Sequence, residues 1–217
     1  GGTASTYNIG GNVALNGTGT FNLGTVANII NITGNATVAG SIVFSTGVAK
    51  TVNLTGNLSG GGTVNMSGGN LAHRLNLGGA TNAITTFTSG TGSIVTYNRS
   101  GDQTVFGGAL ANLTISGGGN KSAQAAITLS NTLTLNSGVL QLGIYNLTLN
   151  NNTATAIQGT PSGTSMVETN GAGYVVRNAA ATTPILFPIG SEGVYAPISI
   201  SATNPTTGTI SGRTTKF

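Results

Sequence analysis

Side chains able to carry acid–base chemistry are few in this 217-residue sequence. Its acids are Asp102, Glu168 and Glu192, it has one histidine, and it has no cysteine. Cleavage of a polysaccharide needs two positioned carboxylates, or an acidic calcium cluster with a basic residue. Glu168 and Glu192 lie 24 residues apart, but the proline-containing sequence between them argues against stacked strands there. We therefore expect no catalytic residue and no enzymatic activity.

The single histidine, His73, has no cysteine or carboxylate near it in the sequence. A transition-metal site needs several such ligands, so we expect no metal site and no cofactor. His73 follows Lys50 by 23 residues and precedes Arg74, which predicts a small basic stripe at one corner of successive repeats. These three residues have two interpretations. They are solvated corner residues, as charges in turns usually are, or they contact an acidic surface polysaccharide.

Charge is scarce along the whole chain. Charged residues make up 5% of it, against about 25% in an ordinary domain. The net charge is +4, which reflects few acids, and no basic run or basic–aromatic pattern predicts nucleic-acid binding. No apolar run reaches the length of about 18 residues that a membrane-spanning helix requires. The chain does not begin with methionine, and we expect it to be a piece of a longer protein.

A repeated sequence pattern predicts the secondary-structure elements that position these residues. Tyr7-Asn8-Ile9-Gly10-Gly11-Asn12 recurs at 30–35, at 52–57 and, more weakly, at 75–80. Its leading asparagines are 23, 22 and 23 residues apart (8 to 31, 31 to 53, 53 to 76). This period indicates stacked coils, and asparagine between two apolar residues indicates strands. The structural repeat residues are Asn8, Ile9, Asn31, Ile32, Asn53, Leu54, Asn76 and Leu77.

Further strands keep the same period. Gly19–Leu23 is followed by related segments at 40–44 and 62–66, and a third apolar segment lies between the first two in each coil. Three short strands per coil predict an all-β fold, a parallel β-solenoid or β-helix with coils of about 22–23 residues. We expect glycine at the corners because it adopts positive φ without a clash.

The repeated asparagines allow two structural interpretations. Strict alternation makes Asn8, Asn31, Asn53 and Asn76 an outward, solvent-facing row. Asparagines at corners, namely Asn12, Asn35 and Asn57, suit a ladder that bonds each coil to the next. Amides do not titrate, so neither set predicts catalysis.

The period loosens after residue 76, and the composition changes near residue 155. All five prolines lie at 161, 184, 188, 197 and 205. Since proline is disfavoured inside central strands, we expect the solenoid to span 1–155. Residues 156–217 would form a small β-rich C-terminal module or irregular final coils that cover the open end.

Several segments resemble repeats of a known group of proteins. They are Gly92–Asn98, Asp102–Val105, Ala111–Gly117, Leu133–Leu140 and, near the end, Phe187–Gly190 with Gly193–Ile198. Together they span roughly residues 90–200 and are similar to repeats of large secreted cell-surface adhesin and fibre proteins of Bacteroidetes-type bacteria. The resemblance implies type IX secretion, a location at the bacterial surface and, for some members, gliding motility.

We therefore expect a structural segment of an extracellular bacterial surface protein, a rigid stalk or fibre supporting adhesion or surface motility. Expected partners are other parts of the same protein, identical copies and surface polysaccharide, without nucleic acid or membrane insertion. The first alternative is a polysaccharide-binding or polysaccharide-cleaving β-helix. The second is an ice-binding β-solenoid, although the pairs Thr18/Thr20, Thr86/Thr88, Thr132/Thr134 and Thr153/Thr155 share no common period.

Overall fold

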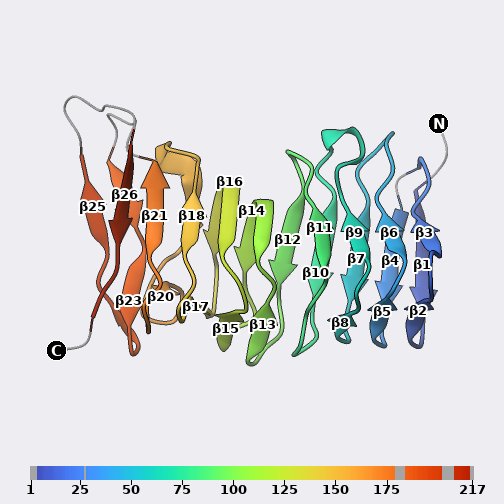
Figure 1. Cartoon of the computed structure of the whole chain (residues 1–217), viewed down its shortest axis with the longest axis horizontal. Coiled ribbons are helices and arrows are strands. Elements are labelled where there is room, and N and C mark those ends of the chain that lie inside the picture. The colour runs from blue at the N-terminus through green and yellow to red at the C-terminus, as the bar shows by residue number, and fades with distance from the viewer. Residues whose placement is uncertain (1–3, 27, 179–183, 202–207, 216–217) are drawn as a thin grey trace.

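The apolar–polar alternation of the repeat produces strands that stack coil upon coil. The computed structural model describes residues 4–26, 28–178, 184–201 and 208–215. They form a β-solenoid of about 8 turns with mostly parallel strands, 50% strand and 3% helix (Figure 1). This confirms the predicted fold class.

Each of the first coils contributes three short strands. The first coil contains β1 (Ser5–Ile9), β2 (Val13–Leu15) and β3 (Thr20–Asn22). The following strands are β4 (Asn28–Ile32), β5 (Ala36–Val38), β6 (Ser41–Val43), β7 (Thr51–Leu54), β8 (Leu58–Ser59), β9 (Thr63–Asn65), β10 (Arg74–Leu77) and β11 (Thr86–Thr88). A short 3₁₀ helix, η1 (Gly68–Asn70), precedes β10.

The later coils are less regular. Their strands are β12 (Ile94–Tyr97), β13 (Gln103–Val105), β14 (Gly108–Ile115), β15 (Asn120–Ala123), β16 (Ile127–Leu135), β17 (Val139–Gln141), β18 (Leu147–Leu149), β19 (Ile157–Gly159), β20 (Val167–Glu168), β21 (Val175–Asn178), β22 (Ile185–Phe187), β23 (Ile189–Ser191), β24 (Val194–Tyr195), β25 (Ile198–Ile200) and β26 (Thr209–Gly212). A second 3₁₀ helix, η2, spans Ala154–Ala156.

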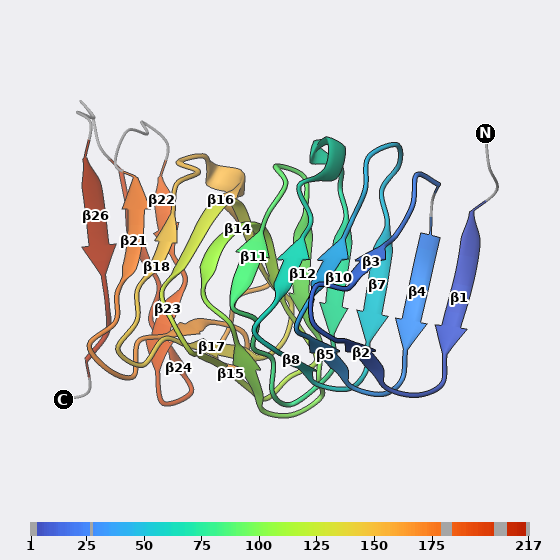
Figure 2. The ribbon, with the colours of Figure 1, turned by 45° about the vertical axis from the view of Figure 1, so that its right-hand side comes forward.

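One sheet runs the length of the stack in the order β1-β4-β7-β10-β12-β14-β16-β18-β21-β26, with β19 also paired to β16. The other walls are the sheets β3-β6-β9-β11, β2-β5-β8 and β13-β15-β17-β20-β23-β24, and a two-stranded sheet joins β22 to β25. Figure 2 shows the first coils wound around a common interior.

The predicted register of the repeat is present. Asn8 pairs with Asn31, Asn31 with Asn53, and Asn53 with Asn76. The neighbouring inward positions form an apolar column in which Ile32, Leu54 and Leu77 are fully buried and Ile9 is partly buried. Burial of each column requires the next coil, because one coil cannot cover its own inward side chains.

Parallel stacking extends beyond the predicted boundary at residue 155. β20 pairs in parallel with β17, β21 with β18, and β23 with β20. The prolines permit this because Pro184 and Pro188 flank β22 rather than interrupt a strand. The Pro188 carbonyl also accepts a hydrogen bond from the Val167 N–H. Among the described strands, β24, β25 and β26 pair antiparallel with their neighbours, and an isolated antiparallel bridge joins Ser162 to Ser165.

Corner glycines serve a different purpose from the predicted one at several positions. Gly34, Gly56 and Gly79 are absent from the glycines with positive φ. A Cβ on Gly56 would overlap the carbonyl oxygen of Gly34, and one on Gly79 would overlap that of Gly56. Glycine is required here because the backbones of successive coils approach closely, not because φ is positive.

Candidate functional site

Lys50 lies inside the solenoid rather than on its surface. Its side chain is 1% exposed, and Nζ donates to the carbonyls of Ser45, Thr46 and Val48 at 2.9, 3.1 and 2.7 Å. The turn that precedes β7 thus folds its carbonyls around the ammonium group, which compensates for the lost hydration. Burial in this turn lowers the pKa of Lys50.

His73 is buried in the next coil, directly against Lys50. Its Nδ1 accepts the Lys50 N–H at 3.1 Å, so Nε2 carries the proton and donates to the Gly68 carbonyl at 2.8 Å. The ring also packs on Phe44, with 5.4 Å between centroids. Burial lowers the pKa of His73, an effect that the nearby Lys50 charge reinforces and the bond to Gly68 opposes.

The predicted polysaccharide contact at Lys50, His73 and Arg74 is therefore not assembled. Lys50 and His73 point into the core, and only Arg74, on β10, is exposed. The solvated-corner interpretation is also wrong for the two buried residues. The polar atoms of both side chains bond to backbone groups inside the solenoid. These residues therefore do not form an exposed basic stripe that could bind an acidic ligand.

Three more long polar side chains cap backbone carbonyls inside the stack. Lys121 Nζ donates to the Arg99 and Gly101 carbonyls, both at 2.7 Å, and burial lowers its pKa to about 8. Gln103, which pairs with Lys121 in register, donates from Nε2 to the Leu77 and Gly79 carbonyls.

Arg177 is 1% exposed and donates to the carbonyls of Leu186 and Asn151. Sequence reasoning missed this whole group of residues. The available signal was their phase, since Lys121 alternates with Ser122 and is in step with the buried Ala123.

The in-strand asparagines form an amide ladder on the outer face of the long sheet. Asn31 Nδ2 donates to Asn8 Oδ1 at 2.8 Å, Asn53 to Asn31 at 2.7 Å, and Asn76 to Asn53 at 2.7 Å. The row then continues in register through Thr96, Thr114 and Thr134. These asparagines thus face outward, as predicted, and also bond coil to coil, which was predicted only for the corner set.

The corner asparagines bond the backbone instead of one another. Asn12 Oδ1 accepts the Asn35 N–H at 2.8 Å, Asn35 Oδ1 accepts the Asn57 N–H at 2.8 Å, and Asn57 Oδ1 accepts the Thr81 N–H at 3.0 Å. Two parallel rows of amides therefore join the first four coils. Their chemistry is structural, because each amide is used to hold the next coil.

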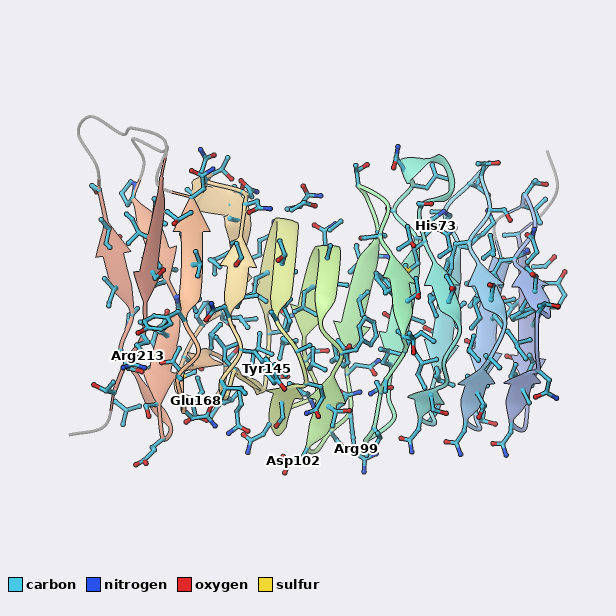
Figure 3. The ribbon with its side chains drawn as sticks, in the orientation of Figure 1. His73, Arg99, Asp102, Tyr145, Glu168 and Arg213 are labelled. Atoms are coloured by element: carbon cyan, nitrogen blue, oxygen red, sulfur yellow. The ribbon has the colours of Figure 1, made fainter. Side chains whose placement is uncertain are left out.

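Two of the three acids meet at the C-terminal end. The parallel pairing of β20 with β23 sets Glu168 beside Gly190, so the 24-residue spacing does reflect stacked strands, contrary to our expectation. Glu168 is 6% exposed and accepts hydrogen bonds from the Glu192 N–H and from Gln141 Nε2. The third acid, Asp102, accepts the Asn120 N–H. Asp102 directly precedes β13 and Glu168 lies on β20, with β15 and β17 between these two strands in the sheet (Figure 3).

A cavity of about 560 Å³ lies beside Glu192. Glu192, Arg213 and Thr214 line it, and the Arg213 guanidinium lies 4.9 Å from the centre of the Tyr174 ring. One acidic and one basic residue therefore belong to the lining of this cavity.

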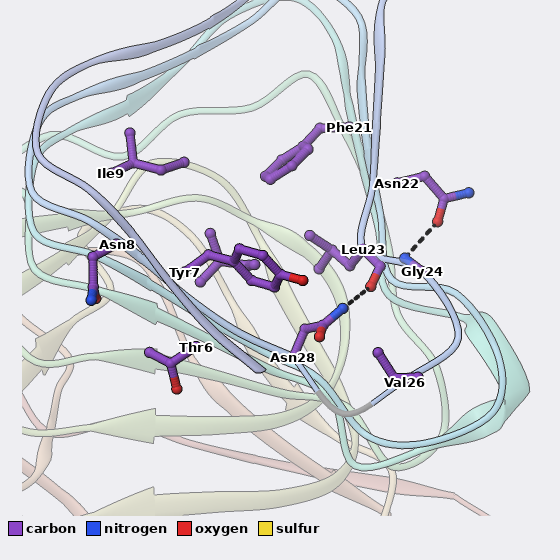
Figure 4. Close-up of a pocket in the computed structure, with 11 residues that line it drawn as sticks. Thr6, Tyr7, Asn8, Ile9, Phe21, Asn22, Leu23, Gly24, Val26 and Asn28 are labelled. Carbon is purple, nitrogen blue, oxygen red and sulfur yellow. Dashed lines mark hydrogen bonds between the residues drawn. The ribbon is translucent and has the colours of Figure 1, made fainter. Parts of the chain in front are cut away.

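A cavity of about 710 Å³ opens at the N-terminal end. Figure 4 shows Tyr7, Ile9 and Phe21 lining it together with Leu23 and Asn28. Asn28 donates from Nδ2 to the Leu23 carbonyl at 2.6 Å. Its Oδ1 is buried and has no hydrogen-bond partner in the described part of the chain.

The threonine pairs of the ice-binding alternative lie on different faces. Thr20 and Thr86 share an outward column with Ser41 and Thr63 on the β3-β6-β9-β11 sheet. Thr132 and Thr134 lie on β16 in the long sheet, and Thr155 lies in η2. No single flat array of these pairs is formed by the residues that the structure describes.

Among the described residues, neither a metal-binding cluster nor a membrane-spanning helix is present. Over residues 4–26, 28–178, 184–201 and 208–215, no three histidine, cysteine or acidic side chains cluster in a way that could hold a metal ion. Within the same ranges, no helix has the length and apolar character needed to span a bilayer. No protein-family model, curated protein or solved structure matches this chain.

Proposed function

We propose that this chain is a structural segment of an extracellular bacterial surface protein, a rigid stalk or fibre that supports adhesion or surface motility. The observation that carries the proposal is the continuous inter-coil bonding of the long sheet. Backbone pairing runs from β1 to β26, and the asparagine ladder adds side-chain bonds along the same direction. Cooperative rows of this kind resist bending and peeling, which is what a load-bearing segment needs.

The buried cations support the same role. Lys50 and Lys121 hold irregular turns to the stack by binding their carbonyls from inside, and Arg177 joins β22 to the segment at Asn151 in the same way. Turns fixed in this way offer few flexible sites to proteases. The resemblance to secreted surface repeats supplies the proposed setting, with identical copies, other parts of a longer protein or surface polysaccharide as partners.

Force spectroscopy on the chain held at its two termini tests the load-bearing role. Coils should detach in successive steps, because each coil contacts only its neighbours, and Asn53→Ala should lower the force of the step that releases its coil. The control is Asn150→Ala, an exposed side chain outside both amide rows. Unfolding of the whole chain at forces near thermal noise would remove the stalk proposal.

A second candidate, polysaccharide binding or cleavage, draws on the C-terminal cavity, which Glu192 and Arg213 both line. A glycan array and a polysaccharide degradation assay on the purified chain separate it from the stalk role. Binding or cleavage that Arg213→Ala abolishes would favour this candidate. Absence of both across acidic and neutral polysaccharides would leave the structural role alone.

A further inference from the structure

A cavity of about 380 Å³ lies in the middle of the stack, where the asparagine ladder ends. Its lining comes from three successive coils, at the ends of β7 and β10 and in the turn after β12. These strands are neighbours in the long sheet (Figure 1). Described coils lie on both sides of the cavity, so its walls are complete within them.

The hollow is produced by a side chain that one coil lacks. Thr55, Gly78 and Asn98 each follow the last residue of their strand and donate their N–H to the coil before. Gly78 therefore places no side chain between Thr55 and Asn98. A Cβ on Gly78 would lie 3.3 Å from its nearest neighbours, without the backbone overlap found at Gly56. Glycine at this position leaves space, and close approach of the coils does not demand it there.

Unpaired polar groups converge on the hollow. Asn76 donates to Asn53, but its register partner in the next coil is Thr96, and no donor among the described residues bonds Asn76 Oδ1. Other polar side chains of the lining also form no hydrogen bond within the described chain, namely Thr55, Asn98 and Ser100. These amide and hydroxyl groups are available to a ligand that carries many hydroxyls.

Arg99 adds a positive charge to the same lining. Its side chain is exposed, and its guanidinium forms no ion pair or hydrogen bond with the described residues. The Lys121 ammonium lies 2.7 Å from the Arg99 carbonyl. Asp102, the nearest acid in the sequence, accepts the Asn120 N–H instead. Two cations and one carboxylate leave this place positive, and no acid is among the described lining residues.

Buried side chains hold both walls of the cavity from inside. Gln103 Nε2 donates to the carbonyls of Leu77 and Gly79, on either side of Gly78, at 2.7 and 2.8 Å. Lys121 holds the turn after β12 in the same way. Groups fixed in advance lose less conformational entropy on binding, so this arrangement suits a binding site.

We propose that this cavity binds a uronate unit of an acidic polysaccharide. The Arg99 guanidinium pairs with the carboxylate, because its planar donors match two carboxylate oxygens. Asn76, Asn98 and Ser100 bond the sugar hydroxyls, and the ring edge enters the space over Gly78. The volume lies within the range of about 300–1,000 Å³ that is common for ligand sites.

The proposal rests on the proposed surface location and gives the polysaccharide partner a site. Load bearing by the stack does not depend on it. Force spectroscopy of the unliganded chain therefore tests the stalk role separately from this site.

Titration calorimetry with galacturonate and mannuronate oligosaccharides tests the site on the purified chain. The acidic oligosaccharides should bind, and the same oligosaccharides with esterified carboxylates should not. Arg99→Gln should weaken binding by about tenfold or more through loss of a charge-assisted hydrogen bond. The matched control is Arg74→Gln, which removes an exposed arginine of the same sheet from outside the cavity. This control should bind as the unmodified chain does.

Gly78→Thr tests the hollow itself, because it restores the side chain that Thr55 supplies in the preceding coil. It should abolish binding while circular dichroism stays unchanged, and Arg99→Gln decides the case if Gly78→Thr fails to fold. The proposal is overturned if no acidic oligosaccharide binds, or if Arg74→Gln weakens binding as much as Arg99→Gln. Binding that Arg213→Ala abolishes and Arg99→Gln preserves would also overturn it, in favour of the C-terminal cavity.

Discussion

Burial decides what the few ionisable side chains of this protein do. Lys50 and His73 were candidates for a surface contact, but each is at most 1% exposed and bonded to backbone groups. Their charges and lone pairs hold turns in place, and their titration is therefore linked to the stability of the fold. Lys121 follows the same rule, with two carbonyls 2.7 Å from its Nζ.

His73 should make the protein acid-sensitive. Burial lowers its pKa below the ordinary value of 6.5, so the unfolded chain binds the proton more tightly and gains stability relative to the fold as pH falls below that value. Protonation of Nδ1 would also remove the acceptor of the Lys50 N–H. The free energy of unfolding, measured with urea, should decrease between about pH 7 and about pH 5.

The control is His73→Gln, since the sequence contains no other histidine. This variant should be less stable at neutral pH but should lose the dependence over the same interval. An equal slope in both proteins would show that His73 is not the source of the acid sensitivity.

At the scale of the strand, an asparagine in the middle of the ladder should contribute more to the free energy of unfolding than one at its end. Asn53 takes part in two ladder bonds and Asn8 in one. With about 1 kcal/mol for each side-chain bond, Asn53→Ala should lower the unfolding free energy by about 2 kcal/mol and Asn8→Ala by about 1 kcal/mol. Urea denaturation of both variants checks the ratio, and equal losses would contradict an energetic role for the ladder.

The corner glycines give a second prediction at this scale. A Cβ on Gly56 would overlap the backbone of Gly34 in the preceding coil, so Gly56→Ala should cost about 1–3 kcal/mol through forced separation of the coils. Gly61→Ala is the matched control, because a Cβ there meets nothing within 4 Å. Thermal melting should show a lower midpoint for the first variant and an unchanged midpoint for the second.

At the scale of the whole molecule, each coil contacts only the coils next to it. A destabilising substitution should therefore loosen only the coils near it. Phe187 is fully buried near the C-terminal end, and its ring lies close to Gly212 of β26. Phe187→Ala should cost about 3–5 kcal/mol by leaving a cavity, and hydrogen exchange should accelerate in β20 to β26 while β1 to β10 remain protected. Uniform acceleration would instead indicate one cooperative unit.

The sequence determined the coils and their register on its own. The period of Asn8, Asn31, Asn53 and Asn76 places identical side chains opposite one another, and alternation then sends Ile32 and Leu54 into the core. A repeat is predictable in this way because each coil meets only its neighbours, so short-range pattern and tertiary contact carry the same information.

Only the tertiary structure decided whether the polar residues between the strands are buried or exposed. Lys50 and His73 look like surface residues in the sequence, but turn carbonyls converge on them from inside. The stacking of Glu168 beside Gly190 was likewise hidden by prolines that flank strands rather than interrupt them. Burial of a charge depends on acceptors from several segments at once, and their convergence is a property of the folded coil that no local pattern records.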